Sequence, residues 1–493
     1  MEMHGKTNSI HLGIEILTPV QCGSGQELFL ELDYVERKKE VFVVDQIGSF
    51  NEIADKKVPD NDDLNNLLKS SKLDDLVQLA GYHGYELKRI VGSGTIPDKI
   101  REHLKDAHFQ PYLAGSALKG AIRTALIAEY LRSSLDTSLL PTVDNRTQRA
   151  TAPKDRADDN LLNALLLDKA TNNNKKDAKN DIFRALHVKD AMFKTDQLCL
   201  VDIRWLNLAN DRNQIIAKWR SMATKKSGVD WKQADGIHAE MLKPKSEASF
   251  SLQWDEFLLS DLSQWHGKAQ NDILPCDFVG LRKKLNAHAH HRLTQEIAFY
   301  HRYGALRPEQ ECQKLLNLLA KDPSSIYLQL SWGSGWRGMT GDWMDDDLVG
   351  KMRELYNLGK DNMPFPKTRR LAVLGEPKLP LGWIRLFSLS QVANNAEPSE
   401  TGQAPQKPDN TTSSVLEKEL AALKTVPIRE WDSRLLQKME QMRWSVEDKK
   451  QVAEKIQQLM IKSNKWCPDY TGTDKDKIKY KERSLNVLKF LND

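Results

Sequence analysis

The 493-residue sequence lacks the motifs and long apolar runs that identify many classes of enzyme and membrane protein. It contains no GxSxG, HExxH or Walker A sequence, and no HRD or DFG motif. No apolar run is long enough to cross a bilayer, and the first ten residues contain no apolar signal segment. We therefore expect a cytoplasmic chain that is not inserted in a membrane.

Cysteine is scarce, and its placement argues against a structural zinc site. The five cysteines lie far apart and form no CxxC pair: Cys22, Cys199, Cys276, Cys312 and Cys467. Their odd number and wide spacing favour free thiols in a reducing compartment. No other cofactor motif is present, so we expect neither a cofactor nor a resident metal.

A strong excess of charge is also missing, since the formal net charge is only +4. The charge is nevertheless uneven. Residues 282–307 hold six Lys/Arg against one Glu, together with four His, and residues 351–385 hold eight Lys/Arg against three acids. Such local excesses predict polyanion-binding surfaces. Solvated faces would give the same pattern.

Several polar clusters admit a catalytic or metal-binding interpretation. His288 and His291 are three residues apart in an expected helix, and 345–347 is a run of three Asp. We interpret the first as a basic helical surface and the second as a solvated acidic turn. His83, His103 and His108 are candidates for acid–base cleavage of RNA, but their spacing singles none of them out.

The pattern of apolar residues divides the chain into an α+β region over 1–393, a linker over 394–413 and a helical extension over 414–493. The linker is rich in Pro, Asn, Ser and Thr, and a capping-box pattern begins at Ser414. Residues 141–181 are mostly polar around a short apolar patch, 161–167. We interpret them as a mobile insertion outside the core. Within 1–393 we expect a helix over 60–80, a long basic helix over 282–302, and strands over 10–17, 28–34, 41–44, 186–193, 198–208, 238–254 (a pair), 326–331 and 381–389.

The stretch 111–130 predicts a helix whose start suits an anion. Gly115 lies in a small-residue turn, and Ser116 is a good N-cap. Apolar residues recur on one face, while Lys119 and Arg123, four residues apart, share another. Free amides, the positive helix end and two cations then suit a phosphate. A surface helix with two solvated cations is the competing interpretation.

Two glycine-rich segments are further candidates. The first contains Gly23, Ser24 and Gly25 between two apolar runs. The second contains Gly333, Ser334, Gly335, Trp336 and Arg337. Gly341 opposes the helix that a dinucleotide fingerprint requires, so we expect a flexible loop with exposed amides. Amides and Arg suit phosphates, and Trp suits base stacking. A glycine turn with its Trp packed in the core is the alternative.

Several segments together resemble the RAMP proteins of CRISPR systems. The segment 113–124, LAGSALKGAIRT, resembles the family's G-S-x-L-K-G-x-x-R motif, and 17–25 resembles its first strand and loop. The segments 188–191, 240–250, 333–338 and 380–383 resemble its Asp motif, Glu-containing hairpin, late glycine loop and a terminal strand of one subgroup. The combination is most similar to the fifth Csm subunit of type III-A effector complexes. The insertion at 141–181 and the tail after 394 depart from the pattern.

The resemblance implies an RRM-like, ferredoxin-like α+β core that grips RNA through its phosphates and has no catalytic residue of its own. It implies a subunit that caps the 3′ end of the CRISPR RNA, contacts the backbone subunits, and supports RNA maturation in antiviral defence by admitting host nucleases. The expected RNA contacts are Gly115, Ser116, Lys119, Arg123, Gly333, Ser334, Gly335, Trp336 and Arg337, with Gly23, Ser24 and Gly25 as weaker candidates. A CRISPR-RNA-processing endoribonuclease on the same fold and a protein-interaction scaffold remain the alternatives.

Overall fold

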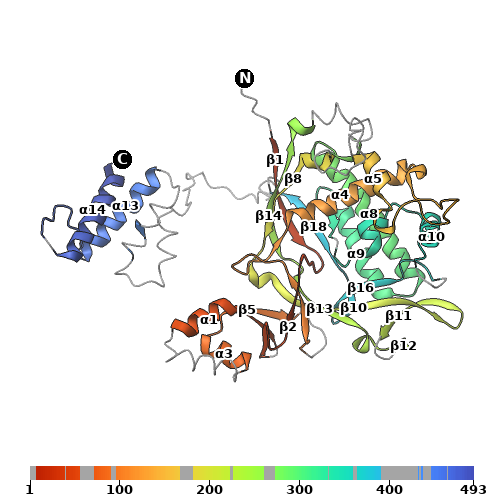
Figure 1. The fold of residues 1–493 in the computed structure, drawn as a ribbon, viewed down its shortest axis with the longest axis horizontal. Helices are drawn as coiled ribbons and strands as arrows, with labels where there is room; N and C mark the ends of the chain where they lie inside the picture. The colour runs from red at the N-terminus through yellow and green to blue at the C-terminus, as the bar shows by residue number, and fades with distance from the viewer. Residues whose placement is uncertain are drawn as a thin grey trace, which may run out of the picture. The chain divides into compact units, whose positions relative to one another are not determined.

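The computed structural model describes most of the chain (Figure 1). It divides into two compact units, Met1–Ala396 and Glu397–Asp493. The described residues are 7–38, 40–55, 72–89, 96–166, 181–221, 226–259, 272–330, 332–358, 363–389, 431, 435–436, 446–463, 465–472 and 474–492.

The first unit is a mixed α+β fold with several sheets, as the sequence predicts. One sheet has the strand order β15–β18–β1–β14–β8, and all its neighbouring strands are antiparallel. Alternate residues of the central strand β1, among them Leu12 and Ile14, are fully buried because they face the main core. The strands are β1 (Thr7–Ile16), β8 (Leu186–Val188), β14 (Glu247–Asp255), β15 (Ile326–Gln329) and β18 (Trp383–Ser388).

Three long helices pack with this sheet. They are α4 (Gly115–Ser134), α8 (Phe278–Arg302) and α9 (Leu306–Lys321). Helix α4 contacts β8 and α8, and α8 in turn contacts α9 (Figure 1). Helix α8 also contacts β15. Leu118, Ile122 and Leu126 of α4 are buried, which confirms the apolar face predicted from their spacing. Helix α8 confirms the long basic helix.

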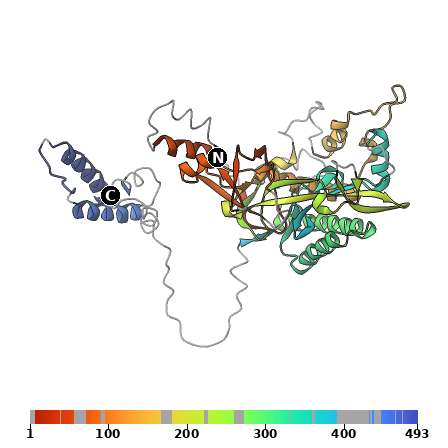
Figure 2. The same ribbon diagram turned by 90° about the horizontal axis from the view of Figure 1, so that it is seen from below.

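The second sheet is larger and carries a separate core. Its main path is β2–β6–β13–β10–β5–β4–β3, and β11, β12, β16 and β17 extend it from β10. The β10–β11 ribbon projects to one side in both views (Figures 1 and 2). The strands are β2 (Gly23–Phe29), β3 (Tyr34–Arg37), β4 (Glu40–Val44), β5 (Gly84–Arg89), β6 (Lys99–His103), β10 (Leu198–Asp211), β11 (Gln214–Ser221), β12 (Lys226–Ser227), β13 (Gly236–Leu242), β16 (Thr368–Leu374) and β17 (Glu376–Pro380).

The predicted strand pair over 238–254 is split between the two sheets. Strand β13 pairs with β10 and β6 in the larger sheet, whereas β14 pairs with β1 and β8 in the smaller one. Lys245, in the turn between them, has a left-handed φ of 69° and donates its amide to the Ile16 carbonyl at 2.7 Å. The two strands are therefore consecutive in the chain without being a hairpin.

Smaller elements complete the first unit. The helices α1 (Gln46–Asp55) and α3 (Leu73–Ala80) contact each other, and Val77 of α3 packs with Val35, Phe42 and Val44 in a small core of its own. The remaining elements are β7 (Tyr112–Leu113), which pairs with β9 (Ala191–Met192), α5 (Asp159–Leu166) and α10 (Asp346–Leu355). The expected helix over 60–80 is present as α3 at its end, and its residues 60–71 lie outside the described residues.

The expectation that 161–167 lies outside the core is wrong for α5. Leu161, Leu165 and Leu166 of this helix are buried and belong to the main core. Polar flanks hid this helix in the sequence, because an apolar run this short, within polar residues on both sides, gives a weak signal. The following stretch, 167–180, and the predicted linker at 394–413 lie outside the described residues.

The second unit contains two described helices of more than one turn, α13 (Val446–Lys462) and α14 (Lys475–Asn492), which pack on each other. Their shared core includes Leu435, Val452, Ile456, Met460 and Val487. Among all the described residues, no helix is long and apolar enough to cross a membrane.

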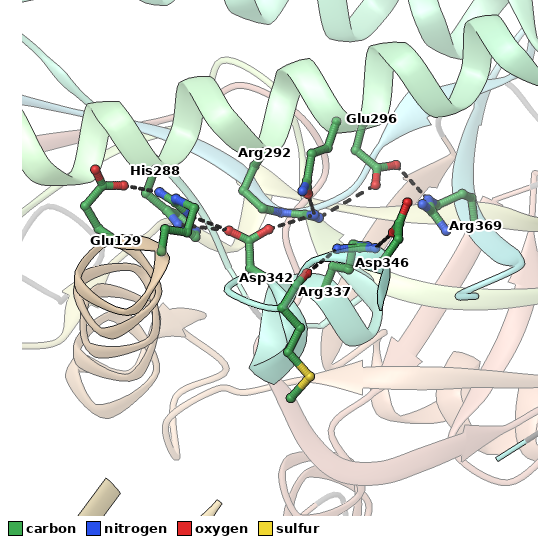
Figure 3. Close-up of polar contacts among 11 residues, drawn as sticks. Glu129, His288, Arg292, Glu296, Arg337, Asp342, Asp346 and Arg369 are labelled. Carbon is green, nitrogen blue, oxygen red and sulfur yellow. Dashed lines mark hydrogen bonds and ion pairs between the residues drawn. The ribbon is translucent and has the colours of Figure 1, made fainter. Parts of the chain in front are cut away.

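One buried carboxylate ties the helices of the first unit to the segment after β15. Asp342 accepts hydrogen bonds from Arg132 of α4 at 2.9 Å and from Arg292 of α8 at 3.3 Å, and its Oδ2 lies 3.3 Å from the Nδ1 of His288 (Figure 3). Burial raises the pKa of Asp342, and the two guanidinium groups oppose this rise. Arg292 is also within 3.8 Å of Glu296, which binds Arg369 of β16 at 2.7 Å.

We predict that Asp342→Ala lowers the free energy of unfolding by about 3 kcal/mol or more, because it leaves buried cations without their partner. Urea-induced unfolding measures the change. The control is Asp346→Asn, which removes a carboxylate that is 91% exposed and paired with Arg337, and it should cost less than about 1 kcal/mol. Equal losses in the two variants would contradict a central role for Asp342.

Candidate nucleic-acid interface

The start of α4 is closed by a carboxylate of the protein itself. The Gly115 amide donates to Asp190 Oδ1 at 2.6 Å. A Cβ at Gly115 would lie 2.1 Å from the Val188 carbonyl oxygen, so only glycine allows this close packing. The prediction that Ser116 is the N-cap is wrong: the N-cap is Ala114, and Ser116 is an exposed residue of the first turn. Asp190, which is distant in sequence, supplies the acceptor instead.

Lys119 and Arg123 lie around another carboxylate, Asp181. Arg123 Nη2 is 3.0 Å from Asp181 Oδ2, and its guanidinium lies 5.5 Å from the Phe183 ring centroid. Burial lowers the pKa of Lys119. The positive charge of Arg123 lowers this pKa further, and the Asp181 carboxylate opposes both effects. The three groups together keep a net positive charge, so an anion can still compete with Asp181 for the two cations.

The first glycine segment begins β2 and lies beside the start of α4. Gly23 pairs with His103 of β6, and Ser24 Oγ donates to Glu102 Oε2 at 2.6 Å. Gly25 has a left-handed φ of 92° within an irregularity of the β2–β6 ladder. The preceding Cys22 is close enough to Ala114 and Asp190 for both to affect its thiol pKa, which burial raises. Segments 22–24 and 114–116 therefore form one neighbourhood.

The late glycine segment is wound into a helical turn, so the expectation of a flexible loop is wrong. Gly333 has a left-handed φ of 86°, and a Cβ there would lie 2.6 Å from Leu381. Residues Arg337–Gly341 form a π-helix. The next residue, Asp342, holds it against α4 by accepting a hydrogen bond from Arg132. Ser334 is buried, and the Trp336 ring packs edge-on against Phe365 with centroids 5.1 Å apart.

Arg337 is engaged in local contacts. It donates to the Met344 carbonyl at 3.3 Å and to Asp346 Oδ1 at 2.8 Å, as Figure 3 shows. Asp345 caps α10 through the Leu348 amide. The Asp run at 345–347 therefore starts a helix and neutralises Arg337. Among the described residues, no group of three or more His, Cys, Asp or Glu is placed to hold a metal ion.

A basic and aromatic pocket of about 700 Å³ lies beside this segment. Five cations line it against one acid, Glu296, which is bound to Arg369. Burial alone would raise the pKa of Glu296, but Arg369 and Arg292 lower it. The sequence indicated the basic stretch 351–385 without showing that part of it lines a pocket with the glycine segment. The lining includes Trp332, Trp336, Phe365, Arg337, Arg353, Lys367, Arg369 and Arg370.

The structure separates the two groups of predicted contacts. The π-helix at Arg337–Gly341 contacts α4, and Arg132 in the last turn of α4 binds Asp342, which follows the π-helix. Lys119 is thirteen residues earlier in α4, which corresponds to about 20 Å along the helix axis. Residues 23–25 and 115–123 thus form one candidate surface, and residues 333–337 belong to a second one.

The candidate catalytic histidines are not assembled into a site. His103 is fully buried, and its Nδ1 accepts the Cys22 amide at 3.3 Å. Burial and the nearby Lys105 lower the pKa of His103 to about 3. His83 lies 3.6 Å from Glu52, and the His108 amide donates to Asp106. A general base needs access to the scissile 2′-hydroxyl, which a fully buried His103 does not have.

We predict that His103 makes the protein less stable as the pH falls. The folded state keeps this imidazole neutral down to a pKa of about 3, whereas the unfolded chain takes up the proton near 6.5. Stability is therefore lost as the pH falls below 6.5, by about 2 kcal/mol at pH 5. Urea unfolding of wild type and His103→Asn at several pH values measures this contribution. Parallel pH profiles for the two proteins would contradict it.

Comparison with known proteins agrees with this architecture. Residues 13–337 match the RAMP superfamily. The chain is 22% identical over 405 residues to the CRISPR system Cms protein Csm5 of Methanocaldococcus jannaschii. The aligned region covers 76% of this chain and 87% of that protein. It is also 23% identical over 142 residues to Csm5 of Streptococcus thermophilus. This aligned region covers 25% of this chain and 40% of the relative.

Solved structures give the same result for the fold. A chain of the cryo-EM structure of a Csm–crRNA–target RNA ternary complex of a type III-A CRISPR–Cas system matches with a TM-score of 0.51 and 22% identity, over 77% of this chain and 100% of that one. The crystal structure of T. onnurineus Csm5 matches with a TM-score of 0.51 and 21% identity, over 76% and 99%. The chain belongs to the RAMP superfamily and is a distant relative of the Csm5 subunits of type III-A CRISPR systems.

Proposed function

We propose that the chain is a non-catalytic, RNA-binding subunit of a type III-A CRISPR effector complex in the cytoplasm. It caps the 3′ end of the CRISPR RNA, ends the filament of backbone subunits, and supports RNA maturation, in part by admitting host nucleases. The observation that carries the proposal is the pocket in which five cations and three aromatic rings gather beside the late glycine segment of a RAMP chain. Cations suit RNA phosphates, and aromatic rings suit unstacked bases.

The strand order supports a ferredoxin-like unit within the fold. When α9 and β15, which come between α8 and β18, are left out, the elements β1, α4, β8, β14, α8 and β18 have the order βαββαβ. Their strands have the order β18–β1–β14–β8, which is fourth–first–third–second, with every pair antiparallel. This unit is our proposed RAMP core. We keep the domain limits 1–393, 394–413 and 414–493 as part of the proposal.

Two surfaces are proposed to contact RNA. The first contains Gly115, Ser116, Lys119 and Arg123, with Gly23, Ser24 and Gly25 beside them. Here Lys119 and Arg123 contact phosphate in competition with Asp181. The second contains Gly333, Ser334, Gly335, Trp336 and Arg337 at the edge of the basic pocket, where Trp336 offers a ring and the segment offers amides.

We predict that Lys119→Ala combined with Arg123→Ala weakens binding of single-stranded RNA and reduces its salt slope by about 0.7 for each phosphate that the variant no longer binds. Asp181→Asn should have the opposite effect, because Arg123 loses its competing carboxylate while Asn can still cap the 3₁₀ turn at Ile182–Ala185. Fluorescence anisotropy at several salt concentrations measures both effects. Arg307→Ala with Lys314→Ala, on α9, is the matched control for the removal of two charges. Unchanged binding in the first variant would remove the α4 start from the RNA site.

The proposed function itself is tested by purification of the complex from its host. We expect CRISPR RNA and backbone subunits to co-purify with the full chain. Sequencing should show that the bound RNA molecules have their 3′ portion in common. Site-specific cleavage of precursor RNA by the pure protein in EDTA would favour an endoribonuclease instead. Failed assembly with intact RNA binding after deletion of residues 414–493 would assign the scaffold role to the extension.

A further inference from the structure

Two arginines from distant parts of the chain meet over one tryptophan. Trp332 follows β15, and its ring centroid lies 5.2 Å from the Cζ of Arg101 on β6 and 5.4 Å from the Cζ of Arg370 on β16. The strands β13 and β10 run between β6 and β16, so these two strands are about 14 Å apart across the sheet. Trp332 packs on the small core that includes Ala239 and Ala372 of this sheet. Its indole therefore supports both guanidinium groups by cation–π contact.

The two guanidinium groups are like charges in a half-buried place. Within the described part of the chain, no carboxylate lies within ion-pair distance of either one. Glu27, which lies opposite Arg101 in the β2–β6 ladder, is bound to Lys99 at 3.0 Å. Burial lowers the pKa of Arg370, and Arg101 lowers it further. Two cations that each lie within 5.4 Å of the same ring centroid, and have no carboxylate at ion-pair distance among the described residues, favour the binding of an anion.

This arginine pair lies between two hollows. Trp332 and Arg370 line the basic pocket of about 700 Å³. Arg101 lines another pocket of about 510 Å³, which also contains Trp205, His238 and two acids, Glu27 and Asp98. Trp205 of β10 is directly opposite Arg370 in the β10–β16 ladder, so the two pockets approach each other at the arginine pair. An extended anion that continues into both hollows fits this arrangement better than a compact one.

We propose that Arg101 and Arg370 form a binding site for one phosphate of single-stranded RNA, with Trp332 as the residue that positions both guanidinium groups. The flanking nucleotides then enter the two pockets. Arg presents a planar set of donors that matches phosphate oxygens. The inference rests on the proposed function, since it locates a phosphate contact for that RNA, and it adds two residues that no motif in the sequence indicated.

The test is equilibrium binding of a fluorescent single-stranded RNA to the full-length protein across a salt series. Arg101→Gln and Arg370→Gln should each weaken binding about tenfold and reduce the salt slope by about 0.7. The double variant should reduce the slope no further, because both side chains serve one phosphate. Arg370→Lys should keep most of the slope while losing affinity, since it keeps the charge but not the planar donors. Trp332→Leu should also lower affinity with the slope kept, because both cations remain but are no longer positioned.

The control variant is Arg307→Gln, which removes an exposed arginine of α9 that is paired with Glu376. Thermal unfolding verifies that each variant is folded. If wild type binds RNA and the double variant binds it equally well, the phosphate site is overturned and the proposed function stands. If wild type shows no salt-dependent RNA binding, both are overturned. If the double variant keeps RNA binding but no longer assembles with the other subunits, the arginines bind a protein carboxylate, and the phosphate site is again overturned.

Discussion

The fold of the first unit depends on the buried Asp342 carboxylate. One side chain accepts bonds from Arg132 of α4 and Arg292 of α8 and contacts His288 (Figure 3). It follows the π-helix at Arg337–Gly341 directly, so the late glycine segment is anchored to both helices through this residue. The position of Trp336 and Arg337 at the edge of the pocket is therefore a consequence of helix packing, and not a property of a free loop.

The same chemistry explains why the number of cations overstates the RNA-binding surface. Arg292 and Arg369 belong to basic stretches that look like polyanion sites, yet both are bound to Glu296 or Asp342 in the interior. Arg123 and Arg337 are paired with Asp181 and Asp346. Buried charges need partners, so Arg292, the cation that α8 carries into the core, is used within the protein. A cation that packing leaves without a carboxylate can bind RNA directly, whereas a paired one such as Arg123 must exchange its carboxylate for a phosphate.

Local patterns in the sequence predicted the elements well and their partners poorly. The apolar periodicity of α4 and the strand pattern of β1 and β18 need only neighbouring residues, and these predictions are confirmed. Ser116 was expected to cap α4, but a carboxylate 75 residues away accepts the Gly115 amide. The π-helix at Arg337–Gly341 and the separation of β13 from β14 likewise depend on contacts with distant strands and helices. The motifs still identified the family, because residues such as Gly115 are fixed by those long-range contacts.

The contact of Arg101 and Arg370 with Trp332 is a feature that sequence patterns do not predict. Arg101, Trp332 and Arg370 share no spacing, and strands of the larger sheet bring them together. The glycine segment contributes indirectly: Gly333 adopts a left-handed φ and packs against Leu381, immediately after Trp332. A side chain at Gly333 would clash with Leu381 and displace the indole. The value of the late glycine motif then lies partly in placing Trp332 in contact with two cations, and only partly in the amides that its composition suggests.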